Sequence, residues 1–148
     1  EGKNYIRFGI VGGMGNVNQW YYYAAEIKDQ IQAIDEILMD SQNMGVFAVG
    51  DRASYLGMGK EVISSRKWRE LQSVDADNAI VGCFDHEGSS VYYVVNNDFE
   101  NKQKITLHFD NKYGYDVIQR GKTASVVGES LTLTVETGEG VLVKLRTK

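Results

Sequence analysis

Asn78–Asp85 (NAIVGCFD) and Ser90–Asn96 (SVYYVVN) decide the fold of this chain. Both runs are rich in β-branched and aromatic residues, which favour a pleated, half-buried backbone. His86–Ser89 (HEGS), between them, has the glycine and polar residues of a tight turn. The two runs therefore predict an antiparallel hairpin.

The same signal continues to the C-terminal end of the sequence. Apolar residues occupy every second position of Lys104–Phe109, Ser130–Val135 and Val141–Leu145, so one face of each predicted strand is buried. Further short strands are predicted at Gly45–Gly50, Glu70–Val74, Tyr113–Ile118 and Thr123–Val127, with turns at Asp110–Lys112 and Gly128-Glu129. About seven or eight strands with short connections, and no helix among them to connect parallel strands, predict an antiparallel β-sandwich over residues 44–148.

One long helix is predicted before the sandwich, from Gln19 to about Asp40. Its apolar residues recur at intervals of four and three, which places them on a single stripe: Trp20, Ala24, Ile27, Ile31, Ile34 and Leu38. A short strand at Tyr5–Val11 and a glycine-rich turn at Gly12–Asn16 are predicted before it. Residues 1–43 therefore form a strand, turn and helix segment whose apolar stripe must pack on something.

The composition excludes several classes of function. The chain has 148 residues, a net charge of −4 and no large cluster of basic residues, so nucleic-acid binding is not expected. No apolar run is long enough to predict a membrane span. Its single cysteine, Cys83, excludes an intrachain disulfide and a paired-cysteine metal site, and lies in a β run as a small core residue would.

The sequence Gly13-x-Gly15 after a predicted strand and before a helix imitates a dinucleotide-binding turn. The third glycine of that fingerprint would lie at position 18, where the chain has Asn18, and Asp51 is too distant to contact a ribose. A plain flexible turn is the favoured interpretation.

Two polar groups have alternative interpretations. Asp75–Asn78 (DADN) resembles the opening of a calcium loop, but it lacks the glycine and distal glutamate of an EF-hand, and Asx side chains also build turns without an ion. Asp85, His86 and Glu87 could form a metal site or an acid–base pair, but they lie at a predicted hairpin turn. The turn interpretation is favoured for both groups, and His108 has no evident partner.

Aromatic residues offer a candidate carbohydrate contact. Trp68 and Tyr92 are the residues we assign to it, because aromatic rings stack on the apolar faces of sugars. Tyr92 and Tyr93 must point to opposite faces of their strand, so only one of them is exposed on a one-sided sheet. Tyr113 and Tyr115 share a face with Val117, which favours the core.

Two segments resemble parts of a known enzyme family. The helix Trp20–Leu38 followed by Gly45-Val-Phe47, and the closing strand in Gly138–Leu145 (GEGVLVKL), resemble the last barrel helix and the C-terminal β-sandwich of (β/α)-barrel glycoside hydrolases of the β-galactosidase-like, family 42 type. The resemblance implies that residues 1–43 are the end of a truncated barrel. The catalytic carboxylates of that family lie on earlier barrel strands, so none is carried over to this chain.

The resemblance implies a non-catalytic accessory β-sandwich domain of a bacterial carbohydrate-degrading enzyme, packed on the catalytic barrel of the same polypeptide. It also implies a periplasmic or extracellular location. The alternative is a stand-alone carbohydrate-binding module. No catalytic, cofactor-binding or metal-ligating residue is predicted, and we expect no turnover by this chain alone.

Overall fold

The computed structural model describes residues 19–55 and 62–146. The predicted strand Tyr5–Val11 and turn Gly12–Asn16 lie outside these residues. The elements are α1 (Gln19–Met39), β1 (Gln42–Gly50), the short 3-10 helix η1 (Asp51–Tyr55), β2 (Leu71–Asp75), β3 (Asn78–His86), β4 (Ser89–Asn96), β5 (Gln103–Gln119), β6 (Lys122–Val135) and β7 (Gly140–Leu145).

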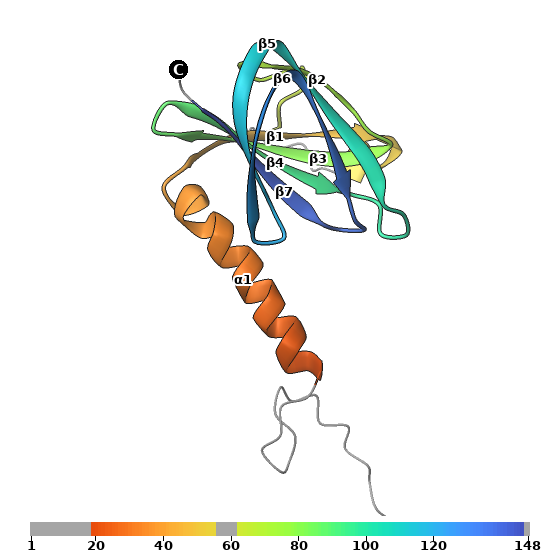
Figure 1. Ribbon diagram of the computed structural model, residues 1–148. Coiled ribbons are helices and arrows are strands. Elements are labelled where there is room, and N and C mark those ends of the chain that lie inside the picture. Colours follow the sequence, from red (N-terminus) through yellow and green to blue (C-terminus); the bar gives the residue numbers. More distant parts are fainter. Residues whose placement is uncertain (1–18, 56–61, 147–148) are drawn as a thin grey trace, which may run out of the picture.

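The seven strands form one antiparallel sheet that curls over on itself (Figure 1). The order is β1-β3-β4-β7-β5-β2, and β6 pairs with β5 along its other edge. The first half of β5 pairs with β2, whereas its second half pairs with β7. The predicted antiparallel β-sandwich preceded by one helix is therefore confirmed, with β5 and β6 shared between its two layers.

Two predicted turns are wrong. Asp110–Lys112 and Gly128-Glu129 lie inside β5 and β6, which the structure shows as two long bent strands rather than four short ones. The register between β5 and β6 shifts between the His108 and Tyr113 pairs. Such an irregularity bends a strand without ending its pairing, and this bend carries the hairpin from one layer to the other.

The core lies between the two layers. Its fully buried large side chains include Tyr92, Tyr115, Phe47, Leu71, Ile105 and Leu107. Residues from β1, β3, β4 and β7 pack there against residues from β2, β5 and β6. Cys83 and Tyr115 are completely buried and Tyr113 packs against this cluster, as the sequence predicted.

Helix α1 packs on the outer face of the sheet with the second half of its apolar stripe. Ala33, Ile34, Ile37 and Leu38 cover a small second cluster formed by Val91, Ile118 and Leu142. The first half of the helix continues past the edge of the sandwich (Figure 1). Within the described residues, no helix is long and apolar enough to cross a membrane.

Candidate interaction site

A cleft of about 420 Å³ opens where α1 leaves the sheet. One wall is the helix, with Ile27, Ile31 and Ile34 spaced so that they lie on one face. The floor includes Tyr93 of β4 and Ile118 of β5. The opposite wall is formed by the β5–β6 turn and the β6–β7 turn, which contribute Arg120, Gly121 and residues 136–140.

The apolar wall is only half covered. Ile34 packs against the sheet, whereas the side chains one and two turns earlier stay in solvent, with Ile31 at 54% and Ile27 at 57% exposure. Tyr21, Tyr22 and Tyr23 are also exposed, at 44%, 62% and 45%. Of the three, Tyr23 lies four residues before Ile27 and therefore shares its face of the helix, whereas Tyr21 and Tyr22 point to other sides.

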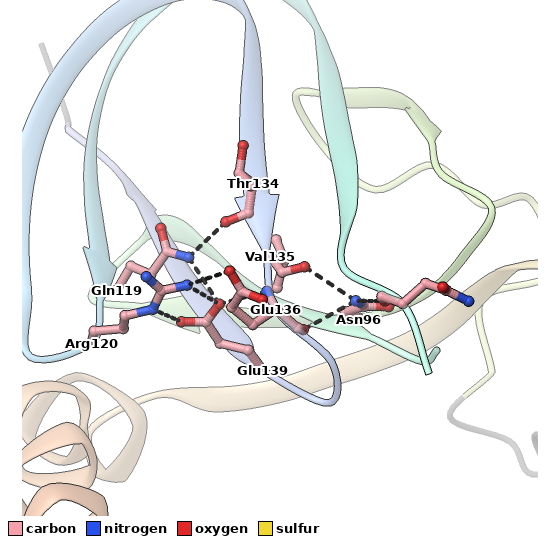
Figure 2. Close-up of polar contacts among 8 residues, drawn as sticks. Asn96, Gln119, Arg120, Thr134, Val135, Glu136 and Glu139 are labelled. Atoms are coloured by element: carbon pink, nitrogen blue, oxygen red, sulfur yellow. Dashed lines mark hydrogen bonds and ion pairs between the residues drawn. The ribbon is translucent and has the colours of Figure 1, made fainter. Parts of the chain in front are cut away.

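The polar wall is held by the ion pair of Arg120 and Glu139 (Figure 2). Arg120 donates from Nε to Glu139 Oε1 at 2.7 Å and from Nη2 to Oε2 at 3.1 Å. Glu139 also accepts from the backbone N–H of Glu136 at 2.8 Å and from Nε2 of Gln119 at 3.1 Å. Because these donors come from two different turns, the carboxylate joins the turns and fixes the rim of the cleft.

Arg120 and Glu139 each shift the pKa of the other toward the charged form. Burial raises the pKa of Glu139, but the hydrogen bonds from Arg120, the Glu136 backbone and Gln119 outweigh it, so the pKa lies below its usual value. The hydrogen bond to Glu139 in turn raises the pKa of Arg120. Both groups are therefore ionised at neutral pH, and their partners are within the domain.

A second polar group lies behind this rim. The buried side chain of Asn96 donates from Nδ2 to the carbonyls of Asn101, Val135 and Glu136, at 2.9, 3.2 and 3.0 Å. Its Oδ1 accepts from the backbone N–H of Asp98 at 2.9 Å and from Nε2 of Gln103. These contacts tie the β4–β5 loop to the end of β6, as Figure 2 shows in part.

The two residues predicted to contact carbohydrate differ in exposure. Tyr92 is completely buried, and its hydroxyl donates to the carbonyl of Trp68 at 3.1 Å, so it has no ring face to offer a sugar. This half of the expected platform is corrected: Tyr92 points inward and Tyr93 outward. Trp68 is partly exposed, packs edge-on against Tyr92, and carries the guanidinium of Arg69 at 4.5 Å from its ring. A sugar contact at Trp68 stays a prediction.

The Asp85, His86 and Glu87 group does not converge on one point. Asp85 accepts from the backbone N–H of Gly88 and pairs with Arg69, and these bonds lower its pKa. His86 Nδ1 lies 3.0 Å from Nζ of Lys144, so a lysine that donates there requires a neutral imidazole. Glu87 is exposed at the turn. The arrangement matches the turn interpretation.

The DADN segment likewise directs its polar groups to separate partners. Asp75 Oδ2 lies 2.8 Å from Nε2 of His108, a partner that the sequence did not indicate. The backbone N–H groups of Asp77 and Asn78 donate to Oε1 of Gln103, and Asn78 Oδ1 accepts from the backbone of Arg52. In residues 19–55 and 62–146 no group of three His, Cys, Asp or Glu side chains is placed to hold a metal ion.

The single cysteine of the chain, Cys83, is buried in the core. Burial raises the pKa of the Cys83 thiol to about 12, so it stays protonated at neutral pH.

The comparisons with known proteins identify no relative. No family model matches the chain, and neither a curated protein nor a solved structure matches it.

Proposed function

We propose that this chain is a non-catalytic accessory domain that packs on a neighbouring protein unit through the first half of α1. The observation that carries the proposal is the change of environment along one apolar stripe. Ala33, Ile34, Ile37 and Leu38 are covered by the sheet, whereas Ile27 and Ile31 are more than half exposed. A stripe longer than the surface beneath it indicates a second surface to cover the remainder.

The energetics favour a protein partner. Burying the remaining exposed area of Ile27 and Ile31 stabilises a contact by roughly 1 kcal/mol for each side chain. Tyr23, one turn before Ile27, adds aromatic area with a polar hydroxyl, a combination that is enriched at protein interfaces. Glu26 and Gln30 line the same cleft and supply a polar rim on the helix side.

A variant series with a hydrophobic dye tests the exposed stripe. We expect the chain to enhance the fluorescence of an anilinonaphthalene dye, and the double variant Ile27→Ser/Ile31→Ser to lose most of that signal at unchanged stability. The matched control is Ile34→Ser, which should lower the free energy of unfolding by about 2 kcal/mol because Ile34 is packed on the sheet. A monomer by sedimentation that binds no dye would contradict the proposal.

In its finer form, the proposed neighbour is the catalytic barrel of a glycoside hydrolase in the same polypeptide. The support is the resemblance of α1 and the closing strand to the end of such enzymes. The test is to assay both this chain and the full product of its gene on chromogenic glycosides. Turnover by the full product alone would support this form, and turnover by the isolated chain, or by neither, would count against it.

A further inference from the structure

Strand β6 forms a long hairpin with β5, and the edge of β6 that faces away from β5 is free. Among the described strands it pairs only with β5. All residues from Lys122 to Val127 are exposed, including the apolar side chains of Val126 at 37% and Val127 at 60%. β5 and β6 run together as one bent hairpin, so this edge is long and accessible (Figure 1).

The turn before β6 fixes which backbone groups face this edge. Arg120 and Gly121 have φ angles of 52° and 71°, as in the two-residue turn that joins hairpin strands of natural twist. Gln119 and Lys122, which close the turn, are therefore a hydrogen-bonded pair, and such pairs alternate along the strands. Lys122, Ala124 and Val126 thus bond to β5.

The intervening residues of β6 direct their N–H and C=O groups away from β5: Thr123, Ser125 and Val127. One contact in β5 supports this assignment independently. Gly114, opposite Val127, uses its carbonyl to accept from Arg146 N at 2.9 Å on the other side of β5, rather than bonding to β6. The free edge therefore offers the backbone groups of three alternate residues for pairing with another strand.

The sequence at this edge lacks the usual protection of edge strands. Thr123–Gly128 (TASVVG) has no charge and no proline, and three of its six residues are β-branched. Natural proteins protect such edges with charges, prolines, bulges or covering elements, and an edge without them is a template for pairing with another strand. A lysine and a glutamate flank the run, Lys122 at its start and Glu129 at its end.

We propose that this edge pairs with β6 of a second copy of the chain, antiparallel and centred on Ser125. In that register Ser125 lies opposite Ser125 of the partner subunit, and Thr123 lies opposite the partner's Val127. All three outward residues then bond in both copies, which gives about six backbone hydrogen bonds across a two-fold axis. Val126 is covered by the partner's Ala124 on the other face.

Charge favours this orientation. An antiparallel pair centred on Ser125 places Lys122 opposite the partner's Gly128, so no like charges oppose each other along the run. A parallel pair would instead align Lys122 with the partner's Lys122, and like charges across strands are destabilising. The edge is therefore complementary to itself in hydrogen bonding and apolar cover, without opposed like charges, which favours a second copy over an unrelated peptide.

Cysteine substitution tests the register directly. In the proposed pair the two Ser125 Cα atoms lie about 5.5 Å apart, within the range that a disulfide spans. Ser125→Cys should therefore form a covalent dimer on mild oxidation. Thr123→Cys is the matched control, because its two copies lie about 13 Å apart in this register and should stay uncrosslinked. Crosslinking of both variants alike, or of neither, would overturn the register.

A proline tests the pairing itself by sedimentation equilibrium of the full chain. Ser125→Pro removes an outward N–H without taking one from β5, so the hairpin is kept while the free edge is blocked. We expect the dimer dissociation constant to rise at least about tenfold with an unchanged circular dichroism spectrum. Val127→Lys, which only adds an exposed charge, should weaken the dimer in the same direction.

Three results would overturn the proposal: a wild-type chain that stays monomeric at high concentration, a dimer that both variants leave intact, or a dimer that is lost only in Ile27→Ser/Ile31→Ser. The last result would assign self-association to α1 instead. The accessory-domain proposal does not depend on this edge, so the two can fail separately.

Discussion

The guanidinium of Arg120 makes a two-point contact with the carboxylate of Glu139, with Nε 2.7 Å from Oε1 and Nη2 3.1 Å from Oε2. The two residues belong to different turns of the sheet. Their contact therefore joins the two turns that form the wall of the cleft opposite α1.

Glu139→Gln tests how much this contact stabilises the domain. The amide keeps one acceptor oxygen but turns an N–H₂ group toward donors, so we expect the free energy of unfolding to fall by about 1 kcal/mol in urea denaturation at neutral pH. Glu136→Gln is the control, because its carboxylate lies 3.6 Å from Arg120 and is half exposed, and it should change little. Equal losses in the two variants would show that the two-point geometry is unimportant.

The same pair predicts a pH dependence. The folded pKa of Glu139 lies below its unfolded value, so the unfolded state binds the proton more readily. The stabilisation is therefore complete above the unfolded pKa and is lost as the pH falls through the folded pKa. The stability difference between the wild type and Glu139→Gln should shrink as urea titrations move from pH 6 to pH 3. A difference that stays constant over this range would contradict the assignment.

Asn96→Ala tests the buried amide behind the cleft. The substitution leaves the carbonyls of Val135 and Glu136 and the side chain of Gln103 without their partner, so we expect a loss of about 3 kcal/mol in the free energy of unfolding. Asn101→Ala is the control, because its exposed side chain donates to Asp98 at 3.3 Å. A loss below about 1 kcal/mol for Asn96→Ala would mean that water replaces these bonds.

The carbohydrate alternative predicts different roles for Trp68 and Tyr92. Tyr92→Phe should lower stability by about 1 kcal/mol through the lost bond to the Trp68 carbonyl, and should leave any retention on polysaccharide affinity gels unchanged. If the chain binds sugar at this place, Trp68→Ala should abolish the retention. Retention that survives Trp68→Ala would remove the platform altogether.

The strand pattern was predictable because alternation is local. Leu131, Leu133 and Val135 alternate with polar residues, and the structure buries these three. The bends in β5 and β6 were not predictable. Asp110–Lys112 has turn-forming residues, and its continuation as strand depends on pairing partners that lie far along the chain. Local propensity therefore located the strands, but it predicted β5 and β6 as two short strands each.

Only the helix wall of the cleft could be predicted from the sequence. The spacing of Ile27, Ile31 and Ile34 predicts an apolar face, but nothing in it indicates where the sandwich surface ends. Arg120 and Glu139 lie in turns that sequence reasoning treated as plain connections, and their contact depends on the folded sheet. The self-complementary edge at Thr123–Gly128 could have been noticed as an uncharged β-branched run, but its exposure follows only from the strand order.

Hydrogen exchange along α1 tests the central claim most directly. Amide exchange of the helix is compared between this 148-residue chain and the full product of the gene that encodes it, with peptides that separate Tyr21–Ile31 from Ala33–Leu38. We predict that protection of Tyr21–Ile31 rises at least about tenfold in the full product, while Ala33–Leu38, already packed on the sheet, changes little. Equal exchange of Tyr21–Ile31 in both proteins would contradict the claim that this half of the helix packs on a neighbouring unit.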